Sequence, residues 1–250
     1  MGIGTFLLLF ILCFIVFNII PKYPYLKVSK ATGLINEGKI EEGLELFSKV
    51  LKNKNVDYMT KIRYVFTELK FGDLKKAKES ISYILAEPKL PRGMRYEAKA
   101  VFALILYKEG SLDDAKELMS DVYENYKNTN MYCTLGYLYN VLETSEEAVR
   151  FNLEAYEFNS THHTVMDNLG QAYYLNGEYD KAEEMYKELI EKNPAFPEPY
   201  YNYALVLIKK GDLEYANELM SEALAKPFNN LTTVTKEEIK IQIERINPNE

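Results

Sequence analysis

The pattern of apolar and polar residues is clearest between His163 and Phe196, where it predicts two helices joined by a tight turn. Asn176 and Gly177 tolerate positive φ and mark the turn, and Pro194 ends the unit because proline cannot donate the next helical hydrogen bond. On either side of the turn, apolar or small residues recur at three-to-four spacing, at Met166, Leu169, Gly170 and Tyr173 and then at Ala182, Tyr186 and Leu189. The stretch therefore reads as one helix–turn–helix unit.

The same arrangement recurs along most of the chain. Successive second helices open with a small residue, and most of these lie 33 or 34 residues apart, at Gly43, Ala77, Ala115, Ala148, Ala182 and Ala216. The fourth unit departs from the pattern at three positions, one of which is Ser145, where most units have a bulky residue. Glu143 replaces the glycine that marks the other turns, and Asn152 stands where the other units have a bulky apolar residue. A fixed period of this length indicates a repeat architecture.

The spacing of Leu-Gly, Tyr, Ala, an aromatic residue and Pro resembles the tetratricopeptide (TPR) repeat. The resemblance implies an all-α fold, a TPR-type α-solenoid of about six helix-turn-helix repeats with a C-terminal capping helix, preceded by one transmembrane helix. The expected domains are an anchor helix at 1–20, a connector at 21–23 and a TPR superhelix at 24–250. Its repeats are expected at 24–57, 58–95, 96–128, 129–162, 163–196 and 197–230, and its capping helix at 235–247.

Helix-start signals agree with these boundaries. Asp73, Ser111 and Asp212 stand where a side-chain oxygen can cap a second helix, and Thr144 to Glu147 supplies a capping box where the fourth turn lacks glycine. A second capping box, Thr235 with Glu238, opens the final amphipathic segment. We expect that segment to cover the last repeat, with a free partner-binding helix as the alternative.

The second and third units are separated by an insertion. Pro88, Pro91 and Gly93 make it an irregular loop. It is either a hinge or a tolerated insertion, and the sequence leaves both open.

Residues 3–20 carry no charge, and Thr5 and Asn18 are their only polar side chains. As a helix the stretch would be roughly 27 Å long at ~1.5 Å per residue, enough to span a bilayer core. The stretch lacks the charged start and the cleavage site of a cleaved signal peptide, so we expect an uncleaved, single-pass anchor. Lys22, Lys27 and Lys30 follow the stretch and no Lys or Arg precedes it, so the positive-inside rule places the TPR body in the cytoplasm.

Charge and candidate chemistry favour binding over catalysis. A net charge of −7 disfavours nucleic acid, which needs a basic face. Cys13 and Cys133 lie in different segments, which suggests neither a disulfide framework nor a metal site. There is no phosphate loop and no nucleophile motif. We therefore expect neither an enzyme nor a bound cofactor or metal.

In TPR arrays the first helices of successive units line a concave groove, and the resemblance implies that a protein or peptide partner binds there. Amides could bond its backbone and tyrosines could pack against it. The expected partner-binding residues are Tyr137, Asn140, Asp167, Asn168, Gln171, Tyr174, Tyr201 and Asn202.

The leading functional hypothesis is a membrane-tethered interaction scaffold or adaptor on the cytoplasmic face. Three alternatives remain open from the sequence. They are an extracytoplasmic assembly factor for exported proteins, an organelle import-type receptor, and a regulatory subunit of a membrane enzyme. The sequence leaves the oligomeric state open.

Overall fold

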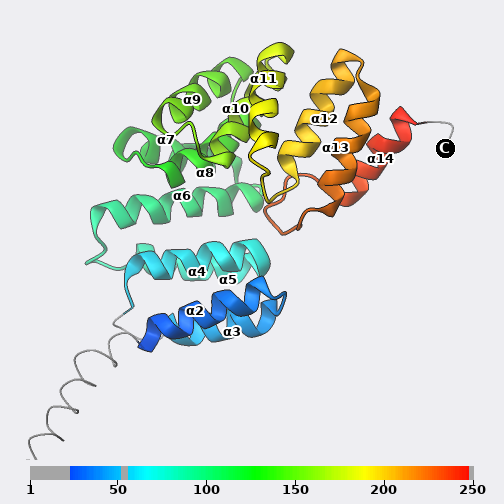
Figure 1. The fold of residues 1–250 in the computed structure, drawn as a ribbon. Helices are drawn as coiled ribbons and strands as arrows, with labels where there is room; N and C mark the ends of the chain where they lie inside the picture. The colour runs from blue at the N-terminus through cyan, green and yellow to red at the C-terminus, as the bar shows by residue number, and fades with distance from the viewer. Residues whose placement is uncertain (1–22, 52–55, 248–250) are drawn as a thin grey trace, which may run out of the picture. The chain divides into compact units, whose positions relative to one another are not determined.

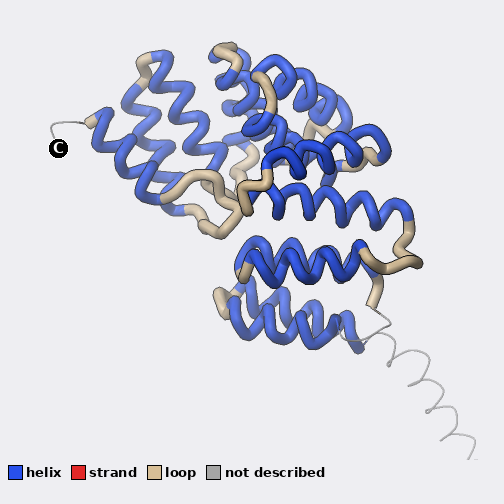
Figure 2. Tube along the Cα trace, turned by 180° about the vertical axis from the view of Figure 1, so that it is seen from behind, coloured by secondary structure: helices blue, strands red, loops and turns tan. Residues whose placement is uncertain are grey.

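The computed structural model describes residues 23–51 and 56–247, which form helices joined by short turns and contain no strand (Figure 1 and Figure 2). Six pairs of consecutive helices are followed by a single one. The helices are α2 (Tyr23–Asn36), α3 (Ile40–Leu51), α4 (Tyr58–Phe71), α5 (Leu74–Leu85), α6 (Arg92–Lys108), α7 (Leu112–Asn125), α8 (Thr129–Leu142), α9 (Ser145–Phe158), α10 (His163–Leu175), α11 (Tyr179–Glu191), α12 (Glu198–Lys210), α13 (Leu213–Ala225) and α14 (Lys236–Ile246). The predicted all-α, TPR-like solenoid of helix pairs is confirmed in these ranges.

The chain divides into two compact units, Met1–Met94 and Arg95–Glu250. The division lies just after the proline-containing loop that the sequence marked as a hinge or an insertion. The first helix of the third pair, α6, begins at Arg92, ahead of the expected start of the third repeat at 96.

The predicted anchor over residues 3–20 lies outside the described residues, so it stays a prediction. Within 23–51 and 56–247, no helix is both long enough and apolar enough to cross a membrane.

Small residues occupy the helix crossings, as the register predicts. Ala77, Ala115, Ala182 and Ala216 are fully buried. In the first pair the crossing is tighter, because a Cβ on Gly43 would lie 2.5 Å from a side-chain carbon of Ile35. This close approach explains why the first unit carries glycine where the others carry alanine.

The helix caps follow the sequence with two exceptions, of which the first is that Thr144 and Glu147 form only half of the predicted capping box, through the Thr144 hydroxyl. The side chains of Asp73, Thr144 and Asp212 accept hydrogen bonds from backbone N–H groups in the first turn of the following helix. The Ser111 prediction is wrong, because its side chain makes no cap hydrogen bond. Asp212 has a turned backbone, with ψ 79°. Its carboxylate is nevertheless long enough to accept a hydrogen bond from Tyr215 N.

The fourth turn shows why Glu143 can replace glycine there. Glu143 has φ −110°, an ordinary conformation for any residue, whereas Gly177 in the fifth turn has φ +77° and needs glycine. The departure at Glu143 is therefore compatible with the backbone it occupies.

The last helix, α14, closes the core of the last two pairs. Ile239 is fully buried, Ile243 and Ile246 pack beside it, and Thr235 with Glu238 forms the predicted capping box. The expected capping helix is confirmed.

Candidate functional site

The first helices of the four pairs in Arg95–Glu250, α6, α8, α10 and α12, share one surface, which we call the inner face. The hydroxyl of Tyr107 on α6 lies 3.2 Å from that of Tyr137 on α8, with the ring centroids 5.6 Å apart. Burial lowers the pKa of Lys108 on α6, and the carboxylate of Glu198 on α12 opposes this shift. The charges of Lys108 on α6 and Glu198 on α12 therefore influence each other.

The eight expected partner-binding residues fall into two groups. Asn140, Asp167, Asn168 and Asn202 are buried, with 4–8% of each side chain exposed. Tyr137, Gln171, Tyr174 and Tyr201 are half-buried. Only the second group has surface that a partner could contact directly.

The buried asparagines bond to one another and to the backbone. Asn140 Nδ2 donates to the Asn168 carbonyl oxygen at 2.9 Å and to Gln171 Oε1 at 3.0 Å. Asn168 Nδ2 donates to the Cys133 carbonyl oxygen at 3.0 Å. Asn152, the exception in the fourth repeat, donates to Asn140 Oδ1 at 2.9 Å. We call Asn152, Asn140 and Gln171 the amide relay, which runs from α9 through α8 to α10.

The relay occupies space left by a missing side chain. A Cβ on Gly136 would lie 2.4 Å from Asn152 Oδ1 and 2.7 Å from Asn168 Nδ2. Glycine on α8 therefore lets both amides approach the helix backbone.

Two buried acids, Asp167 on α10 and Glu198 on α12, lie next to these amides. Burial, reinforced by the charge of Glu198, raises the pKa of Asp167 to about 8. Asn202 Nδ2 donates to Asp167 Oδ1 at 3.2 Å, and Glu198 Oε1 accepts from the Thr233 backbone N–H at 2.9 Å. At neutral pH Asp167 is therefore largely protonated, and Glu198 and Lys108 carry the charges of this part of the inner face.

Aromatic surface flanks these polar groups. Tyr174 packs 5.7 Å from Tyr179, and burial raises the pKa of both Tyr174 and Tyr201. Gln242 of α14 opposes this rise in the pKa of Tyr201, so α14 borders the inner face at its C-terminal end.

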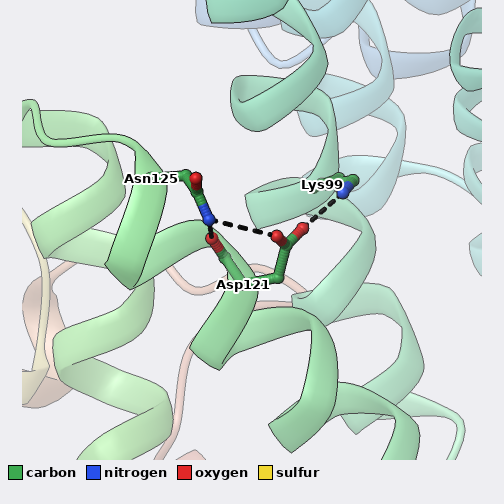
Figure 3. Close-up of polar contacts among 3 residues, drawn as sticks. All are labelled: Lys99, Asp121 and Asn125. Atoms are coloured by element: carbon green, nitrogen blue, oxygen red, sulfur yellow. Dashed lines mark hydrogen bonds and ion pairs between the residues drawn. The ribbon is translucent and has the colours of Figure 1, made fainter.

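The sequence reasoning missed three side-chain clusters. Glu154 accepts from Lys127, Tyr123 and Tyr132, and these bonds hold the pKa of Glu154 down at about 2 despite partial burial. Tyr126 and Asn128 both donate to Glu97. Figure 3 shows the third cluster, in which Lys99 of α6 pairs with Asp121 of α7 and Asn125 Nδ2 donates to the Asp121 carbonyl oxygen at 2.9 Å.

Cys133 and His162 form a further contact that the sequence did not predict. Cys133 Sγ lies 3.3 Å from His162 Nδ1, and burial raises the pKa of the thiol to about 12. The sulfur is therefore a neutral thiol at neutral pH and not an activated nucleophile. The sequence did offer one signal for this contact. Cys133 and His162 are separated by nearly one repeat, and residues with that separation lie on adjacent helix pairs.

Comparison with known proteins agrees with this architecture. A family model described as TPR repeat matches residues 170–211. The TPR repeat-containing protein MJ1428 of Methanocaldococcus jannaschii is 26% identical over 169 residues, which cover 67% of this chain and 29% of the relative. The chain thus spans less than a third of that relative's length.

Two solved structures share the fold. A tetratricopeptide repeat protein from Parabacteroides merdae matches with a TM-score of 0.67 and 14% identity, covering 94% of this chain and 88% of that one. An IFIT1 monomeric mutant, solved with Gppp-AAAA, matches with a TM-score of 0.69 and 16% identity, covering 90% of this chain and 55% of that one. Together with the repeat period and the helix pairs, these matches support the chain as a TPR repeat protein.

Proposed function

We propose that this chain is a membrane-tethered scaffold that binds a protein partner, as a peptide or a helix, on the inner face of Arg95–Glu250. The observation that carries the proposal is the row of half-buried aromatic and amide side chains on the first helices. Tyr137, Gln171, Tyr174 and Tyr201 offer apolar faces with polar ends, a composition enriched in protein interfaces. The TPR-like fold supports the same class of function, protein–protein interaction.

The charge of the inner face favours a protein ligand over a nucleic acid. Glu198 raises the pKa of Asp167 to about 8, which leaves Asp167 largely uncharged at neutral pH, and it opposes the lowering of the Lys108 pKa by burial. A phosphate backbone would need several free cations at this surface. A neutral or basic peptide segment can bind without such cations.

Tethering is proposed from the sequence of residues 3–20, and the cytoplasmic orientation from the lysines that follow it. We further propose that the chain binds without catalysing a reaction. Its polar clusters are used for hydrogen bonds between repeats, and the Cys133 thiol is not activated.

Site-specific photocrosslinking in cells tests the proposed binding face. A photoreactive residue at Tyr174 should crosslink a discrete protein, and one at the exposed Glu184 on the outer helix α11 should not. Crosslinks that form at Glu184 and not at Tyr174 would overturn the inner-face assignment. An engineered cysteine at Tyr83, 76% exposed, reports the topology in intact cells, and labelling by an impermeant reagent would overturn the cytoplasmic orientation.

A further inference from the structure

The amide relay fixes the direction in which each of its side chains donates. Carbonyl oxygens only accept hydrogen bonds, whereas an amide side chain has one accepting end and one donating end. Asn152 Nδ2 contacts the carbonyl oxygens of Ala148 at 3.0 Å and Gly136 at 3.3 Å. The donating end of Asn152 must therefore point towards α8, and the oxygen of Asn140 accepts from it.

The second step transmits this direction to Gln171. Asn140 uses its oxygen for Asn152, so its amino group faces α10. The Asn168 carbonyl oxygen, 2.9 Å away, independently requires a donor at that position. Gln171 must then accept from Asn140 through Oε1. Its amino group is left pointing away from the relay, and it donates to no residue in the described part of the chain.

We infer that the inner face of this protein recognises a main-chain carbonyl of an extended peptide through the amino group of Gln171, and that Asn140 and Asn152 are the positioning residues that orient it. This inference rests on the proposed function and adds the chemistry of one contact. Without the relay, the amide of Gln171 could turn either end towards the ligand. With the relay in place, Gln171 offers donors only.

The surrounding charges select the kind of acceptor. Asp167 lies one helical turn before Gln171 on α10, and Glu198 is close enough to raise the pKa of Asp167. Asp167 is therefore largely protonated at neutral pH, and the Glu198 carboxylate is the acid that would repel a carboxylate ligand; an uncharged peptide carbonyl would not be repelled. Tyr174, at i+3 from Gln171, supplies apolar surface for the neighbouring peptide side chain.

The orientation of Gln171 can be measured without a ligand. Gln171 and Gln242 are the glutamines of the chain, so side-chain ¹⁵N labelling of glutamine in the full chain, held in detergent micelles, gives assignable signals. A Gln242→Leu variant identifies the Gln171 pair. We expect the Gln171 amino protons to exchange freely with water. In Asn140→Asp, whose carboxylate only accepts, the amide should turn over and its exchange should slow about tenfold.

Protected Gln171 protons in the wild-type protein would overturn the inferred orientation. Unchanged exchange in a folded Asn140→Asp variant would also overturn it.

The ligand contact is tested with short random peptides displayed with both ends joined to the carrier, so that no free carboxylate is present. Peptides selected on the wild-type full chain should bind about tenfold more weakly to Gln171→Glu, which presents an acceptor instead of a donor. The matched control Glu184→Gln on α11 should leave their affinity unchanged.

The outcomes separate the inference from the proposed function. If Tyr174→Ala weakens binding and Gln171→Glu does not, the carbonyl contact is overturned and the inner-face scaffold stands. If binding appears only once a free terminal carboxylate is supplied, the neutral-carbonyl assignment is overturned. If no peptide depends on either residue, both proposals fall.

Discussion

The fourth and fifth repeats fill the crossing between their two helices with different kinds of side chain, a polar amide in the fourth and an aromatic ring in the fifth. Asn152 and Tyr186 occupy the same place in the repeat, both are fully buried, and each lies against a glycine of the preceding helix. Tyr186 fills its site with a ring that stacks 6.0 Å from Tyr203. Asn152 fills its site with an amide that bonds to α8. The Tyr186 hydroxyl donates one hydrogen bond to the Asp167 carbonyl oxygen at 3.2 Å, whereas Asn152 bonds to a side-chain amide and so orients a polar side chain of the inner face.

The aromatic bulk of the fourth repeat has moved by one position. Phe151, directly before Asn152, is buried and stacks 4.0 Å from Tyr139. It also packs edge-on against Tyr123 of α7. The fourth repeat therefore keeps an aromatic core towards its predecessor while its crossing with α8 becomes polar. An exception to a repeat pattern can therefore mark a residue that has a second role.

The largest expected effect breaks the aromatic version of the crossing. Tyr186→Ala should lower the free energy of unfolding by about 3–5 kcal/mol, because it removes a fully buried ring and leaves a cavity. Urea unfolding followed by circular dichroism measures the loss. Tyr83→Ala, which removes a mostly exposed ring, is the control and should change stability by less than about 0.5 kcal/mol. Equal losses for the two variants would contradict the register.

The next largest effect is a pH dependence of stability, which we expect to come from Asp167 in the fifth repeat. The folded-state pKa of Asp167, about 8, lies above the ordinary value of 3.8 for an aspartate, so the folded state holds the proton more tightly. The stability that this proton confers is present at low pH and is lost as pH rises towards about 8. Relative to Asp167→Asn, the wild-type protein should lose up to about 1.4 kcal/mol per pH unit between about pH 5 and about pH 7.

Asn152 supplies the matched comparison for pH. The amide relay carries no titratable group, so an Asn152 variant should keep the pH dependence of the wild-type protein. Glu154 does not interfere, because its pKa is lowered from 4.5 to about 2 and its contribution is lost only below this window. A wild-type profile parallel to that of Asp167→Asn would show that Asp167 is ionised in the folded state.

A smaller loss is expected when the polar crossing is made apolar. Asn152→Met installs the residue found at the equivalent positions, Met119 and Met220, and should cost about 2 kcal/mol because the Asn140 oxygen is left buried and unpaired. Met220→Leu, a volume-conserving change in an apolar site, should cost less than about 1.5 kcal/mol. A gain in stability for Asn152→Met would mean that Asn152 is only a defect in the repeat.

The smallest effect tests the glycine contact. A Cβ on Gly170 would lie 2.7 Å from the buried ring of Tyr186, so Gly170→Ala should cost about 1 kcal/mol. Gly33 in α2 has open space around it, and Gly33→Ala should instead stabilise the helix by about 0.4–1 kcal/mol. Thermal melts of the two variants should therefore shift in opposite directions, and shifts of the same sign would contradict the packing.

The repeats and their helices could be predicted from the sequence because their signals are local and recur with a fixed period. Ala182 and its equivalents fixed the register, and the structure buries them as expected. The site could be predicted only in part. Gln171, Tyr174 and Tyr201 do reach the inner face, but Asn140 and Asn168 turn inward.

The direction of an asparagine side chain depends on partners one repeat away, which spacing alone does not reveal. Asn152 was visible in the sequence as an exception, yet its purpose required the position of Asn140. The same limit applies to Glu154, whose three donors come from α7, the following loop and α8. Contacts between repeats depend on how neighbouring helix pairs pack. The repeat period limits this packing geometry but does not determine which side chains meet.

The most direct test of the relay is a double-mutant cycle on Asn140 and Asn152, read out as the free energy of unfolding. If the two amides act as one connected unit, Asn140→Ala and Asn152→Ala should be coupled by about 1 kcal/mol. Asn152→Ala and Asn202→Ala, which share no hydrogen-bond partner, should be additive within about 0.5 kcal/mol. Additive losses for Asn140 and Asn152 would contradict the account, because the amide that orients Gln171 would then be independent of the residue said to fix it.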